Sequence, residues 1–175
     1  TLNETRGSFA LRILLEAGLE GIHGYVARLG EVKEKYRYAL EIAAGSRLGQ
    51  IVVDNDFVAS KAIDILKRKK AGRLTFIPLN RLKKSNNNFS TARFEMKDSR
   101  GYIDKAINLI DYENIYSDVF HYVFGDTKVF TDLDTAKNIK SKSRIVTLSG
   151  ELLESTGAIT GGSKLNRELI FRFGS

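Results

Sequence analysis

Residues 156–164, with the sequence TGAITGGSK, have the residue types of a phosphate-binding loop in nearly the required spacing. Gly157 and Gly162 are separated by four residues, and a hydroxyl and a lysine follow them. A phosphate-binding loop needs Gly-Lys-Ser/Thr in that order, between a strand and a helix, so that the lysine reaches the outer phosphates and the hydroxyl holds magnesium. Here Ser163 precedes Lys164, so the order is reversed. We therefore interpret these glycines as serving the backbone rather than a nucleotide.

Acidic and imidazole side chains could also do chemistry. Two Asp-x-Asp pairs are present, Asp54 with Asp56 and Asp132 with Asp134. Each pair follows a short apolar run and precedes a helical pattern, where an aspartate commonly caps the helix, so Asp56 and Asp134 are predicted caps rather than metal ligands. His23 and His121 stand far apart without ligand spacing, and the chain has no cysteine, which excludes disulfides and thiolate metal sites.

The composition is that of a basic globular chain. It has 175 residues, 42% of them hydrophobic and 28% charged, with a net charge of +7 and a pI near 9.6. The excess of lysine and arginine favours an acidic partner, of which nucleic acid is the commonest. No apolar run reaches the roughly 18 residues of a membrane span, and no signal peptide is recognisable. The first residue is Thr1 rather than Met, so we expect a piece of a longer protein.

Helical patterns stand at both ends of the chain. Residues 9–17 are rich in helix formers, and Gly18 and Gly21 end them. Residues 164–173 place apolar side chains at steps of four, namely Leu165, Leu169 and Phe173. These two predicted helices enclose a compact middle, which indicates a domain inserted between longer helices.

The middle contains an internal repeat. One part begins at Gly24-Tyr25 and the other at Gly101-Tyr102. Each continues with a charged helix that ends in a glycine, Gly45 or Gly125, where a left-handed residue suits a helix C-terminus. An apolar strand, an Asp-x-Asp pair and a second helix follow in each part. Two related αβ units are therefore predicted between residues 22 and 148.

Three further segments complete the prediction. Residues 72–79 read as an extra strand of the first unit, with the only proline, Pro78, near its end. Residues 80–100 are polar, Asn-rich and basic, which is typical of a linker. Two apolar runs flank Ser149-Gly150 and predict a hairpin with a two-residue turn. The segment GAITGG follows. It has no charged or bulky side chain to protect an open sheet edge, so we expect this edge to pair with another strand.

The motifs GIHGYVARLGEV, YRYALEIAAGSRLGQIVVD, GRLTFIPLNRL, YVFGDTKVFTDLDTA and RIVTLSGELLESTGAITGG together resemble the hinge domain of SMC (structural maintenance of chromosomes) proteins, most like the prokaryotic and archaeal ones. The resemblance runs from about residue 21 to residue 162 with the motifs in the same order. It implies an α+β fold, with two pseudo-repeated mixed αβ subdomains flanked by N- and C-terminal helices that begin an antiparallel coiled coil. The implied boundaries are a root helix at 1–18, subdomain 1 at 19–84, a linker at 85–100, subdomain 2 at 101–163 and a root helix at 164–175.

The resemblance also implies a homodimer. The family's glycine-rich motif at the dimer contact falls on Gly157, Gly161 and Gly162, although Ala158 stands where the family often has a second glycine. The intervening Ile159 and Thr160 belong to the same segment. The pseudo-repeat suggests a partner edge in the first subdomain, made of Leu74, Thr75, Phe76 and Ile77.

Basic clusters are the expected DNA contact of this family of hinges. They are Lys67, Arg68, Lys69, Lys70 and Arg73; Arg81, Lys83 and Lys84; and Lys137, Lys140, Lys142 and Arg144. No base-reading motif accompanies them, so we expect sequence-independent contact with phosphates. No cofactor or metal is expected in the domain itself. The resemblance places ATP and Mg²⁺ at distant heads, kleisin-type subunits at those heads, and the whole protein in the cytoplasm on the nucleoid, in chromosome condensation and segregation.

Two other functions compete with this interpretation. A small nucleotide-binding enzyme could be built on GAITGGSK, although the sequence supplies no nucleophile and base to accompany it. A monomeric, sequence-independent nucleic-acid-binding domain would also fit the charge. The mass of the protein in solution separates the dimer from the monomer, and a nucleotide titration tests the enzyme.

Overall fold

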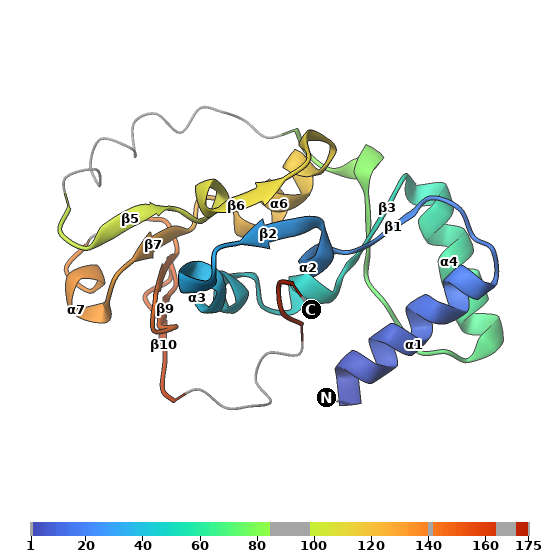
Figure 1. The fold of residues 1–175 in the computed structure, drawn as a ribbon, viewed down its shortest axis with the longest axis horizontal. Helices are drawn as coiled ribbons and strands as arrows, with labels where there is room; N and C mark the ends of the chain where they lie inside the picture. The colour runs from blue at the N-terminus through green and yellow to red at the C-terminus, as the bar shows by residue number, and fades with distance from the viewer. Residues whose placement is uncertain (1, 85–98, 140–141, 164–170, 175) are drawn as a thin grey trace.

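Two αβ units lie side by side in the structure, a computed structural model that describes residues 2–84, 99–139, 142–163 and 171–174. Helices α1 and α4 lie at one end of the molecule and α7 at the other (Figure 1). The first unit contains α1 (Leu2–Glu16), β1 (Ile22–Tyr25), α2 (Val26–Leu29), β2 (Gly30–Val32), α3 (Glu34–Ala44), the 3-10 turn η1 (Gly45–Gly49), β3 (Ile51–Val53), α4 (Asp56–Lys69), β4 (Phe76–Pro78) and η2 (Leu79–Arg81). The second contains β5 (Tyr102–Lys105), η3 (Ala106–Leu109), β6 (Ile110–Tyr112), η4 (Asn114–Tyr116), α6 (Ser117–Phe124), β7 (Lys128–Phe130), α7 (Leu133–Ala136), β8 (Ile145–Thr147), β9 (Leu152–Leu153) and β10 (Ile159–Thr160).

The two units share one plan, so the predicted internal repeat is confirmed. In the first, β1 pairs antiparallel with β3, and β3 pairs parallel with β4; in the second, β5, β7 and β8 pair in the same way. Both antiparallel pairs carry a register shift at the same place. The glycines that end α3 and α6 adopt nearly the same positive φ, 59° at Gly45 and 54° at Gly125.

The predicted alignment of the repeat is wrong in two details. The units correspond from Gly21 and Gly101, whose φ angles are 91° and 85° and whose carbonyls accept bonds from the strand opposite, and not from Gly24 and Gly101. The strand predicted at residues 72–79, expected only in the first unit, also has a counterpart in the second. It forms β4, and β8 is its counterpart in the second unit.

The N-caps of α4 and α7 lie one and two residues before the predicted positions. Asn55 and Asp132 have extended backbones and accept a hydrogen bond from the amide three residues ahead, which is the geometry of an N-cap. Asp56 and Asp134, the predicted caps, instead lie in the first turn of α4 and α7, where a carboxylate still interacts favourably with the helix dipole.

One hydrophobic core extends across both units. Strands β2 and β6 join the units by antiparallel pairing, and Gly30 on β2 lies directly against the second unit. A Cβ on Gly30 would come within 2.5 Å of Ile110 Cδ1 and 2.8 Å of Phe120 Cζ, so only glycine allows this approach. Leu40 on α3 and Phe120 on α6 are fully buried in the same cluster. The units are therefore packed as a single body.

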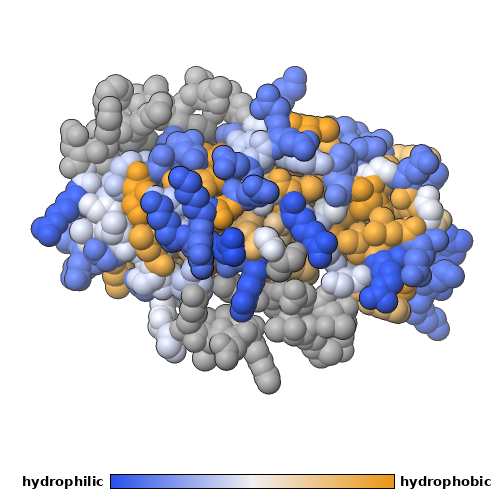
Figure 2. Space-filling view, viewed as in Figure 1, coloured by the Kyte–Doolittle hydropathy of each residue, from blue (hydrophilic) through white to orange (hydrophobic). Residues whose placement is uncertain are grey.

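Helix α1 confirms the helix expected over residues 9–17. It ends as predicted at Gly18, whose φ is 76°, and the amides of Gly18 and Leu19 donate back to the carbonyls of Leu15 and Leu14. Leu14 is buried against α4, whereas Phe9 and Leu15 are more than half exposed. Figure 2 shows apolar surface among the polar side chains on this side of the molecule.

The C-terminal segment differs from the expected helix where it is described. Residues 171–174 form a bend and a turn, while 164–170, with Leu165 and Leu169, lie outside the described residues. Phe173 is 2% exposed, stacks near Phe124 of α6 and donates its amide hydrogen to the buried Glu41 carboxylate of α3. Core burial has therefore outweighed the helical pattern at Phe173. Whether the rest of the segment is helical stays a prediction, and so does the linker at 85–100, of which the structure describes only residues 99 and 100.

The hairpin predicted around Ser149-Gly150 is present as β8 and β9. Its turn is longer than expected, because the amide of Thr147 donates to the carbonyl of Glu151 and leaves three residues between them. Gly150 has a φ of 95° in this turn. A second turn then leads from β9 to β10, which ends the five-stranded sheet in the order β10-β9-β8-β7-β5.

Candidate self-association surface

The glycine segment forms the edge strand β10. Ile159 and Thr160 pair with Leu153 and Leu152 of β9, and no other strand of the described residues pairs with β10. Ile159 is a large apolar residue with 58% of its surface exposed. Its neighbours in the segment are exposed as well: Gly157, Ala158, Thr160, Gly161 and Gly162. The predicted interface residues of the glycine segment thus lie on one open sheet edge.

The main chain of β10 is oriented for pairing with another strand. The amide of Glu154 donates to the carbonyl of Ala158 at 2.8 Å, on the β9 side. Because bonded and non-bonded pairs alternate along an antiparallel ladder, the peptide groups of Ile159 point to the opposite side, toward the open edge. An unpaired donor and acceptor on an edge strand form a template for strand addition.

The glycines on either side of β10 have backbones that other residues rarely adopt. Gly157 has a φ of 103° and Gly162 a φ of 140°, and an added Cβ on either would meet no atom within 4 Å. Gly161 is different, since its φ is not positive, and a Cβ there would lie 3.0 Å from Glu151 Cγ. Two of the glycines are therefore favoured for their torsions, whereas a Cβ on Gly161 would require the Glu151 side chain to shift.

The same geometry argues against a nucleotide loop. A phosphate loop connects a strand to a helix, with its amides wrapped around the phosphates. Up to Ser163 the segment is instead a turn followed by an extended edge strand. Lys164 lies outside the described residues. The backbone before it therefore lacks the loop that the nucleotide interpretation requires.

The proposed partner edge is β4. It pairs only with β3 within the described sheet β1-β3-β4, and Pro78 at its end is compatible with an edge position. Thr75 is exposed, and Leu74 and Phe76 are half-buried. Ile77 is a correction to the predicted set, since its side chain is 3% exposed in the core and its peptide groups face β3 in the parallel ladder, in which Ile51 already donates to Thr75.

An apolar hollow of about 380 Å³ adjoins this edge. Ile63, Leu66 and Leu74 line its apolar part, and the side chains of Lys67 and Arg73 border it. Ile63 is 41% exposed, so part of the hollow is open to a partner. Beside β10, Glu151 and Glu154 precede the strand, and Lys164, which lies outside the described residues, follows it. The two surfaces are complementary in their apolar parts, with an exposed isoleucine on one and an apolar hollow on the other.

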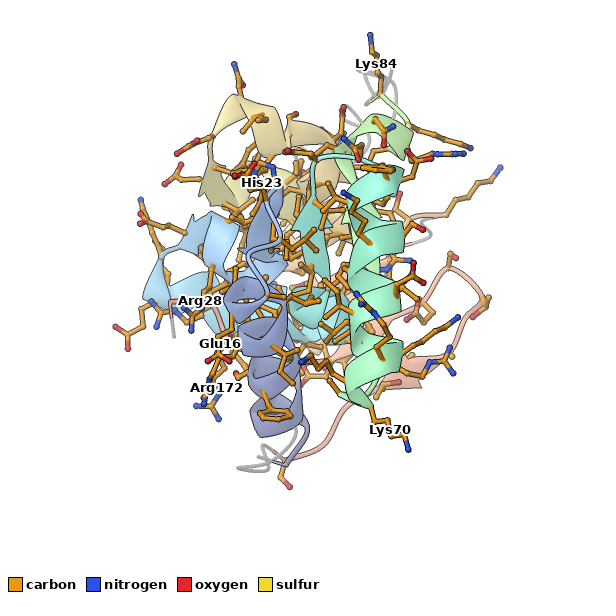
Figure 3. All side chains as sticks on the ribbon, turned by 90° about the vertical axis from the view of Figure 1, so that its right-hand side faces the viewer. Glu16, His23, Arg28, Lys70, Lys84 and Arg172 are labelled. Carbon is orange, nitrogen blue, oxygen red and sulfur yellow. The ribbon has the colours of Figure 1, made fainter. Side chains whose placement is uncertain are left out.

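The basic clusters do not converge on one surface. Lys70 and Lys84 lie at opposite ends of the face that carries α1 and α4 (Figure 3). Lys67, Arg68 and Lys69 form the last turn of α4, and Lys70 follows with a left-handed backbone, φ 50°. Lys83 is exposed beside Lys84. Arg81 forms an ion pair with Asp56 at 2.7 Å. Hydrogen bonds from Arg81 and Asn80 hold the pKa of Asp56 below its usual value.

The third basic cluster is divided. Lys142 is exposed, whereas Lys140 lies outside the described residues. Lys137 lies 3.4 Å from the Asp134 carboxylate. Arg144 is half-buried and donates to the carbonyl of Ala43. This predicted group therefore presents fewer available cations than the sequence suggests.

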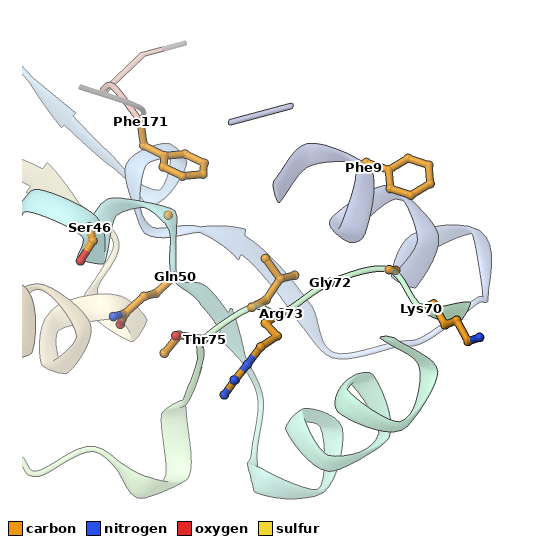
Figure 4. A pocket seen from close by; sticks show the side chains of 11 residues that line it. Phe9, Ser46, Gln50, Lys70, Gly72, Arg73, Thr75 and Phe171 are labelled. Carbon is orange, nitrogen blue, oxygen red and sulfur yellow. The ribbon is translucent and has the colours of Figure 1, made fainter. Parts of the chain in front are cut away.

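A hollow of about 660 Å³ lies between the end of α4 and the returning C-terminal segment. Lys70 and Arg73 border it together with the aromatic rings of Phe9 and Phe171 (Figure 4). Cations beside aromatic rings are the combination that single-stranded nucleic acids bind. Phe9 and Phe171 were not among the residues predicted from sequence, because their proximity to the cations arises only from the fold.

Both histidines make structural hydrogen bonds. His23 bridges the units, with Nδ1 2.7 Å from the Tyr116 hydroxyl and Nε2 2.6 Å from an Asp54 oxygen. His121 contacts the carbonyl of Ser117 through Nδ1 at 2.8 Å. Within the described part of the chain no group of three His, Cys, Asp or Glu side chains could hold a metal ion. No described helix is long and apolar enough to cross a membrane.

Known proteins resemble this chain in sequence and in fold. The family model described as the flexible hinge domain of SMC proteins matches residues 19–140. A chromosome partition protein Smc from Synechococcus is 49% identical over 174 residues, and one from Methanocaldococcus jannaschii is 41% identical over 157. These alignments cover 99% and 88% of the chain but only 14% and 13% of the relatives, so the chain spans about one seventh of their length.

Solved hinge domains have the same architecture. The Geobacillus stearothermophilus SMC hinge, solved as an asymmetric dimer, has a TM-score of 0.82 at 30% identity and covers 90% of this chain and 66% of its own. The Pyrococcus furiosus Smc hinge with an extended coiled coil has a TM-score of 0.77 at 36% identity, covering 97% and 60%. The two-unit α+β fold expected from the sequence is thereby confirmed, and the chain belongs to the family of SMC flexible hinge domains.

Proposed function

We propose that this domain is the homodimerisation hinge of a chromosome-partition ATPase and joins two long coiled-coil arms. The observation that carries the proposal is the open edge of β10, where glycine torsions and outward peptide groups leave an apolar strand unpaired within the described residues. Relatives at 41–49% identity are chromosome partition proteins, and one solved neighbour is a hinge dimer. The exposed Phe9 and Leu15 on α1 suit a helix that continues into an arm.

In the proposed contact, β10 of one chain adds to β4 of the other. Strand addition supplies directional main-chain hydrogen bonds, and Ile159 supplies apolar burial against the hollow beside Leu74. Burying a full isoleucine side chain contributes about 1.5–3 kcal/mol. A two-fold axis makes the same contact twice, since each chain offers both β10 and β4.

The proposal includes sequence-independent contact with DNA. The net charge of +7 supports it, as do the exposed lysines at the end of α4 and the cation-and-aromatic hollow next to them. Contact of this kind releases counterions, so affinity falls steeply as salt rises. Replacing Lys67 and Lys69 together by glutamate is expected to weaken binding to a fluorescent oligonucleotide and to flatten its salt dependence.

The remaining parts of the proposal concern the whole protein. ATP with Mg²⁺ and the kleisin-type subunits would act at distant heads, and the protein would work in the cytoplasm on the nucleoid. The hinge itself would supply no catalysis and hold no cofactor. It would fix the two arms to each other while the heads do the chemistry.

Light scattering of the 175-residue chain across a concentration series tests the dimer. We expect twice the chain mass at micromolar concentration. Gly161→Val with Gly162→Val should return the mass to that of one chain, while Gly24→Val, on a β1 glycine that also has a positive φ, should leave the dimer intact. A wild-type chain that is monomeric at every concentration would instead favour the monomeric nucleic-acid-binding domain.

A further inference from the structure

The C-termini of α3 and α6 meet where the two units join, and an arginine from each unit crosses to the helix of the other. Arg47, which follows α3, donates from Nη1 to the carbonyl of Tyr122 on α6 at 2.8 Å. Arg144, which precedes β8, donates from Nη2 to the carbonyl of Ala43 on α3. This exchange places two cations at the negative ends of two helix dipoles.

The two arginines border a hollow of about 300 Å³. Within the described residues, neither guanidinium has a carboxylate within salt-bridge distance, and Asp126 is the acidic side chain of the lining. Asp126 is already occupied, since its oxygens contact Lys128 at 2.8 Å, Ser143 at 2.5 Å and Lys105 at 3.4 Å. Glu154 also acts on Arg144, and the C-termini of α3 and α6 carry partial negative charge, but the four cations Arg47, Arg144, Lys105 and Lys128 still leave a small surplus of positive charge.

Arg144 is held there against an electrostatic cost. Burial lowers the pKa of the Arg144 guanidinium, Glu154 opposes the shift, and the charge of Arg47 adds to it. Each guanidinium has five N–H donors, and hydrogen bonds within the described residues use one on Arg47 and two on Arg144, the latter to Thr127 and Ala43. Donors thus remain on both side chains for a group that enters between them.

We propose that this hollow binds a phosphate group. Two guanidinium forks that approach from different units can contact different edges of a tetrahedral oxyanion, whereas a planar carboxylate is matched by a single fork. The anion would neutralise the two arginines and relieve their repulsion. Arg47 is exposed and Tyr122 is 39% exposed, so the hollow opens to solvent.

The phosphate could come from a nucleic-acid backbone or from a free phosphate or nucleotide, and both use the same contacts. No residue that lines the hollow belongs to β10 or to the lysine cluster at the end of α4, although the charge of Glu154, which precedes β10, acts on Arg144.

The test is a titration of the chain with inorganic phosphate at constant ionic strength, with chloride as the balancing anion. Binding is followed by calorimetry and by the NMR signal of the Arg144 Nε–H group. We expect saturable binding in the wild type. Arg144→Gln and Arg47→Gln should each weaken it about tenfold or more, the effect of losing one charge-assisted contact. Arg28→Gln, on an exposed arginine elsewhere, should stay within about twofold.

The variants separate binding from folding. Arg144→Gln also loses the bond to Ala43 and so carries a folding risk, whereas the exposed Arg47 can be replaced with less structural cost. A wild-type chain that responds to phosphate no more than to chloride overturns the proposal, and so does an Arg47→Gln variant that binds with wild-type affinity. A short oligo-dT then identifies the source: a shift of the Arg144 signal assigns the nucleic-acid backbone, and an unchanged signal assigns free phosphate.

Discussion

Gly162→Ala should weaken the dimer without weakening the fold of the single chain. Gly162 has a φ of 140°, a region almost restricted to glycine, and an added Cβ would meet no atom of its own chain within 4 Å. The cost is therefore backbone strain rather than a clash. Strain of this kind costs about 1 kcal/mol or more for each residue. In a single chain the exposed end of β10 can relax to avoid it, but in the dimer the partner strand fixes the backbone.

The magnitude follows from the symmetry. Two chains each contribute one strained alanine, so the dimer loses about 2 kcal/mol and its dissociation constant rises roughly thirtyfold. Sedimentation velocity over a concentration series measures this constant, and thermal unfolding measures the stability of the chain.

The matched control is Gly45→Ala. Gly45 also has a positive φ, 59°, and a Cβ added there would meet no atom within 4 Å, but it ends α3 far from β10 in the chain. Gly45→Ala should lower the stability of the fold and leave the dissociation constant unchanged. The reasoning is refuted if Gly162→Ala behaves like this control, losing fold stability while dimerising as the wild type does.

Three further predictions concern stability. Lys70→Gly should raise the free energy of unfolding by about 0.5–1 kcal/mol in denaturant titrations, because Lys70 has a φ of 50° at the end of α4; an unchanged midpoint would show that the residue is not strained. Gly30→Ala should cost about 1–3 kcal/mol, because its methyl group overlaps Phe120 across the joined units; wild-type stability would contradict this packing. Asp126→Asn should cost about 3 kcal/mol by leaving the buried Lys128 unpaired. Burial raises the pKa of Asp126, but hydrogen bonds from Lys128 and Ser143 outweigh it, so the folded-state pKa is lowered. The stabilisation is therefore present above the pKa of an unfolded aspartate and is lost as pH falls through the lower folded value. Over that acid range the melting temperature of Asp126→Asn should depend less on pH than that of the wild type.

The sequence was sufficient for the features that local chemistry controls. The helix at residues 34–44 follows from its glycine end, and the repeat of two units follows from Gly45 and Gly125. Helix α4 is capped instead by Lys70, whose left-handed backbone the sequence does not indicate. The open edge at residues 159–160 was predictable because a short apolar strand flanked by glycines carries no charge to protect it.

Features that depend on distant contacts were not predictable in this way. Phe173 fits a helical stripe in sequence but lies in the core, because Glu41, 132 positions away, accepts its amide hydrogen. Arg144 was predicted only as a member of a basic cluster that contacts DNA, and Arg47 carried no prediction; only the packing of α3 against α6 brings them to one hollow. The observed N-caps, Asn55 and Asp132, lie one and two residues before the predicted ones. Only their extended backbone torsions, which the composition does not encode, distinguish them from Asp56 and Asp134.

The position of Phe173 has a mechanical consequence. Tension applied at the C-terminal end reaches Phe173 first, and through it both α6 of the second unit and Glu41 of the first. Tension applied at the N-terminal end passes along α1 to α4, which belongs to the first unit alone. A pull on the C-terminal end therefore strains the contact between the two units, whereas a pull on the N-terminal end does not.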